Sequence, residues 1–212
     1  MHLPSLSQTM SAQTLLSSAI RNVEGHYHTF AGMNSIFEEA ERVYAYELYH
    51  QLRCLTSKGD IYSAFRIDGE INKALIDQIE NYGLVESHEL PRRSFCPDIV
   101  MHRAQNTREE SGQFLIIEMK RNHGLSQRKI QIDILKLLHY IKSLNFQLGA
   151  FVVFNVINAE ECKNSIVNAM QHIQGVPITF ASKLWVYLTN TNNEIHEEFT
   201  LHSIIPPHLV RV

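Results

Sequence analysis

Two short apolar stretches of this sequence decide the fold: PDIVMH at residues 97–102 and FLIIEMK at residues 114–120. Both have the length and composition of β-strands. Side chains two residues apart in a strand point to the same face, so Glu118 and Lys120 project together from the end of the second stretch. Burying charge beside a run as apolar as residues 114–117 is costly without a partner. The sequence therefore predicts a strand that ends in charges which need partners.

The segment between the two stretches is RAQNTREESG at residues 103–112. It is polar and ends in Gly112, which is typical of a hairpin connection. Strands are therefore expected at 97–102 and 113–119, as neighbours in a sheet. This pairing brings Asp98, which follows Pro97, to the strand beside Glu118.

The rest of the chain predicts further helices and strands. Apolar residues at helical spacing predict two long helices. The pattern is clearest at 127–143, and the other helix is expected at roughly 35–55. Residues 148–156 are an apolar run that is typical of a strand covered on both faces. The remaining expected elements are helices at 8–22 and 159–173 and strands at 62–68 and 183–189. This order predicts an α/β fold with a central mixed β-sheet flanked by helices.

Length and composition limit the kind of protein. The 212 residues suit one α/β domain with modest additions, and apolar runs are too short for a membrane span. The N-terminus lacks the pattern of a secretory signal, and the odd number of cysteines (Cys54, Cys96 and Cys162) favours reduced thiols. We therefore expect a cytoplasmic protein with no membrane partner. The expected division is an N-terminal helix and loop extension at 1–34, a main domain at 35–190 and a tail packed on it at 191–212.

The charge of the chain is uneven. The formal net charge of −3 argues against a generally basic coat for nucleic acid. Between Lys120 and Lys142, however, Asp133 is the single acid among several lysines and arginines. This local basic zone could attract phosphate groups. A solvated loop and helix face is the simpler interpretation of the same pattern.

The charged residues at the two strands have the chemistry of a magnesium site. Mg²⁺ prefers oxygen ligands and usually takes one or two carboxylates together with water and phosphate. Asp98 and Glu118 could supply the carboxylates, and the carbonyl of Met119 a third oxygen. Lys120 would then stand near the attacking water or the phosphate as a compact positive charge. The alternatives are that Asp98 is a turn acid before a strand and that Glu118 and Lys120 form a surface pair.

PDIVMH, then FLIIEMK, after a helix that bears an acid, resembles the PD-(D/E)xK nuclease superfamily. The resemblance covers roughly residues 35–156 and implies a restriction-endonuclease-like core of a helix, three or four strands and a helix. It implies that Asp98 and Glu118 bind the metal and that Lys120 is the family lysine.

The resemblance also implies a glutamate on the first helix and a polar or basic residue on the helix after the second strand. Glu41 lies on the apolar stripe and has the family spacing to Leu52, whereas Glu47 points to the opposite side. Lys136 matches the later position, with Gln131 and Lys129 as weaker candidates. The sequence alone does not decide whether Glu41 or Glu47 is the helix acid.

The resemblance implies a nuclease that uses Mg²⁺ or Mn²⁺ to hydrolyse phosphodiester bonds, with DNA as the expected substrate. Glu41, Asp98, Glu118 and Lys120 are the expected catalytic residues; Lys129 and Lys136 are the expected substrate contacts. One alternative is a catalytically inactive binding module of the same fold, and another is a regulated subunit of a defence or mobile-element system. A homodimer is expected by analogy, because cutting both strands needs two sites.

Overall fold

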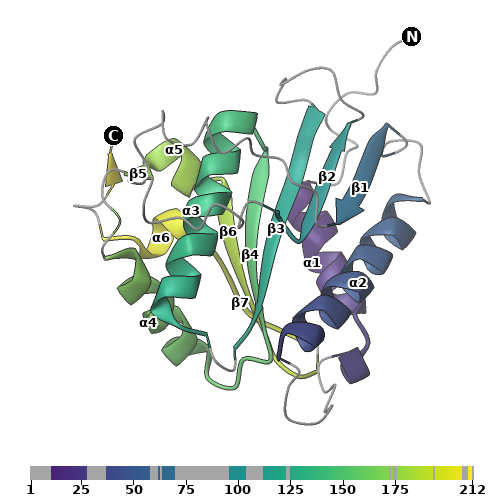
Figure 1. The fold of residues 1–212 in the computed structure, drawn as a ribbon, viewed down its shortest axis with the longest axis horizontal. Helices are drawn as coiled ribbons and strands as arrows, with labels where there is room; N and C mark the ends of the chain where they lie inside the picture. The colour runs from purple at the N-terminus through teal and green to yellow at the C-terminus, as the bar shows by residue number, and fades with distance from the viewer. Residues whose placement is uncertain are drawn as a thin grey trace.

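A six-stranded mixed β-sheet forms the centre of the molecule, and helices cover both of its faces (Figure 1). The computed structural model describes residues 11–27, 37–57, 62, 64–69, 96–103, 112–122, 125–171, 173, 176–192, 194–206 and 210–211. The predicted α/β class, with a mixed sheet between helices, is therefore confirmed.

The order of the elements agrees with most of the sequence-based expectations. The helices are α1 (Ala12–Asn22), the 3₁₀ turn η2 (Gly25–Tyr27), α2 (Phe37–Thr56), α3 (Gln127–Leu144), α4 (Ala159–Met170), α5 (Ile178–Ala181) and α6 (Leu201–Ile204). The strands are β1 (Phe65–Gly69), β2 (Ile99–Arg103), β3 (Gln113–Arg121), β4 (Leu148–Phe154), β5 (Val176–Pro177), β6 (Leu184–Thr189), β7 (Ile195–Thr200) and β8 (Val210–Arg211). None of the described helices combines the length and apolar character needed to cross a membrane.

The main sheet has the strand order β1-β2-β3-β4-β6-β7. The first three strands pair antiparallel, β3, β4 and β6 run parallel, and β7 closes the far edge antiparallel. Parallel neighbours need a crossover connection, which α3 supplies between β3 and β4, and α4 within the connection from β4 to β6. Strands β5 and β8 form a separate small sheet.

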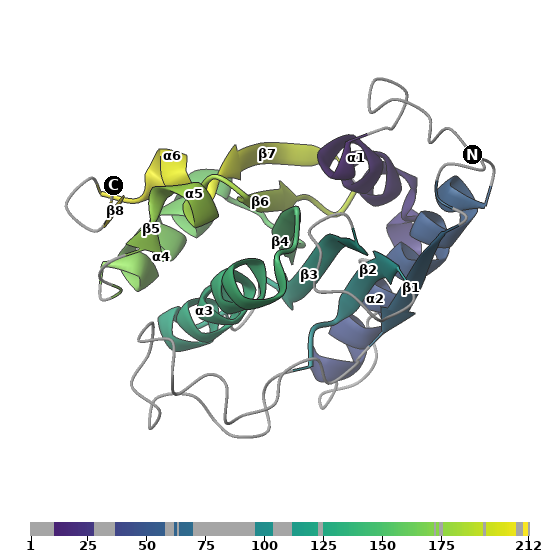
Figure 2. The ribbon, with the colours of Figure 1, turned by 90° about the horizontal axis from the view of Figure 1, so that it is seen from above.

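Helices on the two faces enclose two apolar cores. Figure 2 shows α3 and α4 on one side of the sheet and α1 and α2 on the other. The apolar stripe of α3 packs into the first core, with Ile130, Ile134 and Ile141 fully or almost fully buried. Leu48 and Leu52 of α2 pack into the second core. Every residue of β4 is buried, as predicted for a strand covered on both faces.

The predicted hairpin of β2 and β3 is confirmed, and the two strands differ in length. Ile99, the first residue of β2, lies opposite Ile117. Strand β3 continues for four residues beyond this point, to Arg121. Among the described residues, no strand pairs with the last part of β3 on its β2 side, and this is where the charges of the second sequence stretch lie. The connecting residues 104–111 lie outside the described residues.

Both ends of the chain contribute more to the fold than an extension and a tail. Leu15, Leu16 and Ile20 of α1 are completely buried in the second core, although they belong to the expected extension 1–34. Residues 195–200, in the expected tail 191–212, form the edge strand β7 of the main sheet. Gly69, one residue beyond the expected strand 62–68, pairs with Ile99 at the end of the β1–β2 ladder. The three cysteines are free thiols, as predicted.

Candidate active site

The alternation of β3 sends its charged side chains to the α3 side of the sheet. Ile116 packs into the core under α3, and Ile117 and Met119 pack into the core under α2. Glu118 and Lys120 continue the face of Ile116, because side chains in a strand alternate. Glu118 is 1% exposed, which makes it one of the most deeply buried charged groups in the described residues.

Helix α3 supplies the partners that these charges need. Ser126 caps its first turn by accepting a hydrogen bond from the Lys129 N–H. Further along the helix, Asp133 and Lys136 are one turn apart, and both turn toward β3, where they are buried. A helix places side chains three residues apart on the same face, so the two groups reach β3 together.

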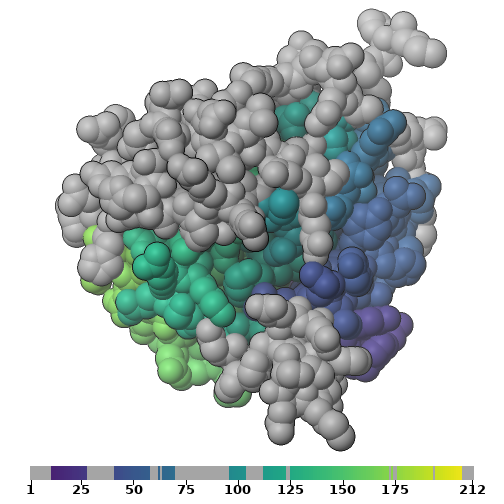
Figure 3. Space-filling model, viewed as in Figure 1, coloured from purple at the N-terminus to yellow at the C-terminus, as the bar shows by residue number. Residues whose placement is uncertain are grey.

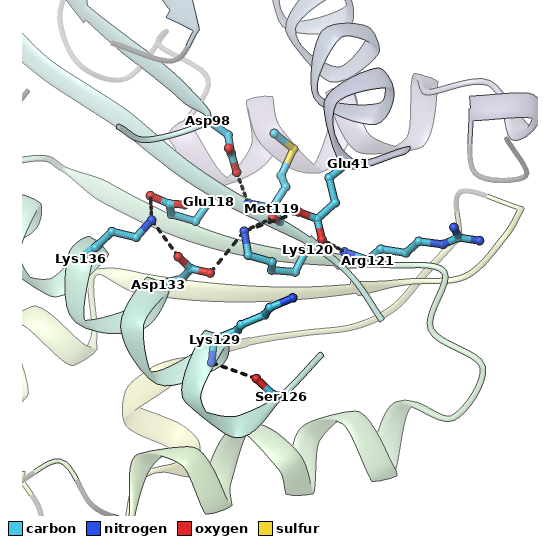
Figure 4. Close-up of polar contacts among 10 residues, drawn as sticks. All are labelled: Glu41, Asp98, Glu118, Met119, Lys120, Arg121, Ser126, Lys129, Asp133 and Lys136. Carbon is cyan, nitrogen blue, oxygen red and sulfur yellow. Dashed lines mark hydrogen bonds and ion pairs between the residues drawn. The ribbon is translucent and has the colours of Figure 1, made fainter. Parts of the chain in front are cut away.

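Ion pairs link the two elements into a continuous chain (Figure 4). Lys136 Nζ lies 3.0 Å from Glu118 Oε1 and 2.7 Å from Asp133 Oδ1. The other oxygen of Asp133, Oδ2, lies 3.3 Å from Lys120 Nζ. One lysine thus bridges two carboxylates, and one carboxylate bridges two lysines. The contact between Lys136 and Glu118 joins α3 to the end of β3.

Asp98 reaches the site through the exposed edge of β3. Its N–H donates to the Ile117 carbonyl at 3.1 Å, and its Oδ2 accepts the Met119 N–H at 2.6 Å. The Met119 N–H would bond to β2 if that strand were longer. The carbonyl of a strand residue points to the same side as its N–H. The Met119 carbonyl therefore faces the side of Asp98, and it accepts a hydrogen bond from Lys120 Nζ at 3.0 Å.

Glu41 approaches from α2, on the opposite face of the sheet. Its Oε1 accepts the Arg121 N–H at 3.1 Å, and its Oε2 lies 3.7 Å from Lys120 Nζ. Glu47 instead accepts a hydrogen bond from Gln51 within α2 at 2.6 Å and is buried. The structure therefore brings Glu41, and not Glu47, into the cluster. Figure 3 shows α3 in teal and α2 in blue on one face of the molecule, and the cluster joins these two helices.

The two acids of the hairpin carry an electrostatic penalty. Burial raises the pKa of the Glu118 carboxyl well above its ordinary value, and the neighbouring Asp98 raises it further, against the opposing effect of Lys136. Burial also raises the pKa of Asp98, although Lys120 and the Met119 N–H oppose this shift. Both shifts disfavour the ionised carboxylates, so extra positive charge at the end of β3 would be favourable.

The two lysines respond in the opposite way to the same surroundings. Burial alone would lower the pKa of Lys120, but Asp133, Asp98 and Glu41 together outweigh it and raise the pKa. Burial likewise opposes the charge on Lys136, and Glu118 and Asp133 reverse that effect, so its pKa is also raised. Both ammonium groups are therefore charged at neutral pH.

The charges of the cluster fit a divalent cation. With every group ionised, its four carboxylates (Glu41, Asp98, Glu118 and Asp133) exceed its two ammonium groups (Lys120 and Lys136) by two negative charges. Among the described residues, no three His, Cys, Asp or Glu side chains form a group that could hold a metal. The geometry explains this, because Lys136 lies between Glu118 and Asp133. Mg²⁺ usually takes only one or two carboxylates together with waters and phosphate.

The structure collects most of the predicted site residues and adds one. Glu41, Asp98, Glu118, Met119, Lys120 and Lys136 lie in one cluster. Lys129 lies in the first, exposed turn of α3, and its side chain takes no part in the ion pairs that join these residues. Asp133 is the residue that sequence reasoning missed, although it is the single acid in the basic stretch and precedes Lys136 by three positions.

No protein-family model, curated protein or solved structure matches this chain.

Proposed function

We propose that this protein is a metal-dependent nuclease with a restriction-endonuclease-like fold, and that it hydrolyses phosphodiester bonds, with DNA as the expected substrate. The observation that carries the proposal is the cluster at the end of β3, where buried acids and lysines meet with two negative charges in excess. A phosphodiester is itself an anion, so an acidic pocket suits it only when a cation joins the site.

The arrangement of the elements supports the same proposal. A helix, three antiparallel strands, a crossover helix and a parallel strand follow one another as α2, β1, β2, β3, α3 and β4. The cluster lies at the carboxyl end of β3, beside its parallel neighbour β4. The carboxyl ends of parallel strands are where open α/β sheets usually bind ligands.

The residues of the cluster would have different roles in the reaction, according to their positions. Asp98, Glu118 and the Met119 carbonyl would hold Mg²⁺ or Mn²⁺. Bound there, the ion would polarise the phosphate and lower the pKa of a water molecule. Exposure of the side chains rises along the chain of ion pairs, from 1% at Glu118 to 18% at Lys120 and 30% at Glu41. The substrate would therefore approach from the Lys120 side, where this ammonium group would orient the attacking water or offset phosphate charge.

The decisive experiment is cleavage of plasmid and linear DNA, and of RNA in a parallel arm, with Mg²⁺, with Mn²⁺ and with EDTA. We expect cleavage that needs the metal and falls by about 100-fold or more in Asp98→Ala and Lys120→Ala. Lys163→Ala serves as the control, because its ion pair with Glu197 lies outside the cluster. Cleavage by both site variants at the wild-type rate would refute the assigned roles.

The second candidate function is a binding module of the same fold without catalysis. The net charge of −3 and the absence of a ready metal-binding group among the described side chains favour it. Calorimetric titration with Mg²⁺ and Mn²⁺ separates the two functions. Metal binding that is lost in Asp98→Ala supports the nuclease, whereas DNA or protein binding without metal binding supports the module. The homodimer stays a prediction, which sedimentation of the protein with and without DNA would check.

A further inference from the structure

The ammonium group of Lys136 lies where a cation would be expected. It is within ion-pair distance of Glu118 and Asp133 at once, and the exposed fraction of its side chain is only 7%. A lysine on a helix surface normally keeps its charge in water. Here the charge is buried against the most deeply buried acid of the site.

The two contacts of Lys136 are unequal. The contact with Asp133 is the shorter one, at 2.7 Å, and both residues belong to α3. The contact with Glu118 is 3.0 Å and crosses from α3 to β3. Lys136 can therefore leave Glu118 and keep its partner on the same helix. Glu118 cannot move away in the same manner, because it belongs to the central strand β3.

We propose that Lys136 is an internal counter-ion, which neutralises Glu118 in the metal-free protein and is displaced from it when a divalent cation binds. The proposal rests on the proposed function, since it concerns the same site. It makes Lys136 a competitor of the metal, and not a fixed part of the metal site. Asp133 holds the displaced ammonium group inside the site, on the side of α3, where it can meet the phosphate of a substrate.

If Lys136 and a metal ion compete for Glu118, the direction of the change in metal affinity is fixed. Two cations that share one carboxylate weaken each other's binding, and the coupling between two such sites commonly changes affinity by a factor of about 5 to 150. Removing the charge of Lys136 should therefore strengthen metal binding. If Lys136 instead organised the metal ligands, removing it would weaken metal binding. The two roles predict opposite changes of the same constant.

The test is calorimetric titration of Mg²⁺ and Mn²⁺ into the full chain at about pH 8, for wild type, Lys136→Met and Lys136→Gln. Glu118 is ionised more fully at this pH, so a change in its protonation contributes less to the measured affinity. We expect both variants to bind the metals about tenfold more tightly than wild type. The control is Lys142→Met, on the same helix but outside the ion-pair chain, which should bind like wild type.

The outcomes separate this proposal from the proposed function. Metal binding by wild type with equal or weaker binding by the Lys136 variants would overturn the counter-ion and leave the nuclease standing. No metal binding by wild type or by either variant would overturn both. If Lys136→Met fails to fold, the comparison rests on Lys136→Gln, which keeps a polar side chain. Thermal melting with and without Mg²⁺ gives a second readout, in which the variants should gain more stability than wild type.

Discussion

Two sets of ion pairs in this molecule use the same chemical groups in different surroundings. The site network runs from buried Glu118 through Lys136 and Asp133 to Lys120. The pair Lys163–Glu197 joins α4 to β7 at 3.0 Å, with each side chain 32% exposed. Distance does not distinguish them, because Lys136 and Glu118 are also 3.0 Å apart. Burial does, since it removes the water that would otherwise stabilise each charge singly.

The two sets differ in what they cost the folded protein. An exposed pair contributes little and can be lost with little effect, so it needs no special explanation. A buried network with unbalanced charge is expensive to form, and a well-packed apolar substitute would often be more stable. The protein nevertheless has such a network at the end of β3. The proposed function would give a reason for this cost.

The largest expected effect is on stability, from removing one lysine of each set. Lys136→Met should lower the free energy of unfolding of the metal-free protein by about 3 kcal/mol, because Glu118 and Asp133 then lose a buried partner. Lys163→Met should cost less than about 1 kcal/mol. Urea denaturation of both variants measures the two values. Equal losses would mean that burial does not distinguish the two sets.

The next effect concerns Asp98. Removing its charge should increase the free energy of unfolding, whereas removing Lys136 should decrease it. Burial raises the pKa of Asp98, so the native protein holds this proton to higher pH than the unfolded chain does. Ionising the group therefore reduces stability as pH rises through the unfolded pKa of about 3.9 and above it. Asp98→Asn, which can still accept the Met119 N–H, should stabilise the metal-free protein at about pH 8 by about 1 kcal/mol.

The gain should vanish at about pH 3, where the carboxyl is neutral in both the folded and the unfolded state. The matched control is Glu197→Gln in the exposed pair, which should give no gain at either pH. Asp98→Asn should also lose the stabilisation that added Mg²⁺ gives to wild type. A stabilised variant that still responds to Mg²⁺ would remove Asp98 from the metal ligands.

Glu41 and Glu47 test where the network ends on α2. Glu41→Gln keeps an acceptor for the Arg121 N–H and loses the ion pair with Lys120, which is partly exposed. It should change stability by less than about 1 kcal/mol and still reduce DNA cleavage by about tenfold or more. Glu47→Gln should leave cleavage unchanged. The reverse pattern in cleavage assays would make Glu47 the helix acid.

The smallest expected effect is that of salt on the stability losses of Lys163→Met and Lys136→Met. Raising NaCl to about 1 M shortens the screening length to about 3 Å and should erase most of the cost of Lys163→Met. The cost of Lys136→Met should stay nearly unchanged, because its partners are shielded from solvent. Urea titrations at low and high salt measure both. A strong salt dependence for Lys136→Met would show that water reaches the network.

The sequence predicted the elements whose patterns are regular. The apolar stripe of α3 and the uninterrupted run of β4 leave few alternatives, and both were confirmed. The pairing of Asp98 with Glu118 followed from the alternation of strands and a hairpin between them. Strand β7 was missed because IHEEFT is a polar edge strand, and charged side chains are common at sheet edges.

Asp133 was missed for a different physical reason. Helical spacing places it on the border of the apolar stripe, where an acid can turn to solvent or toward the sheet. The direction of the Asp133 side chain depends on which residues of β3 lie opposite it. The pattern of residues within α3 contains no information about those residues. Glu41 was predictable because its spacing to Leu52 fitted the resemblance, whereas its contacts with Lys120 and Arg121 could be found only from the structure.

The unequal lengths of β2 and β3 have a consequence for engineering. The Met119 N–H and carbonyl serve the site only because the sheet ladder stops at Ile99. A longer ladder between β2 and β3 would let ordinary sheet pairing occupy both groups, in place of Asp98 and Lys120. The end of β3 would then lose these two contacts while its charged side chains remained. A search for active relatives by their charged residues alone would not detect this change, because it lies in the length of one strand.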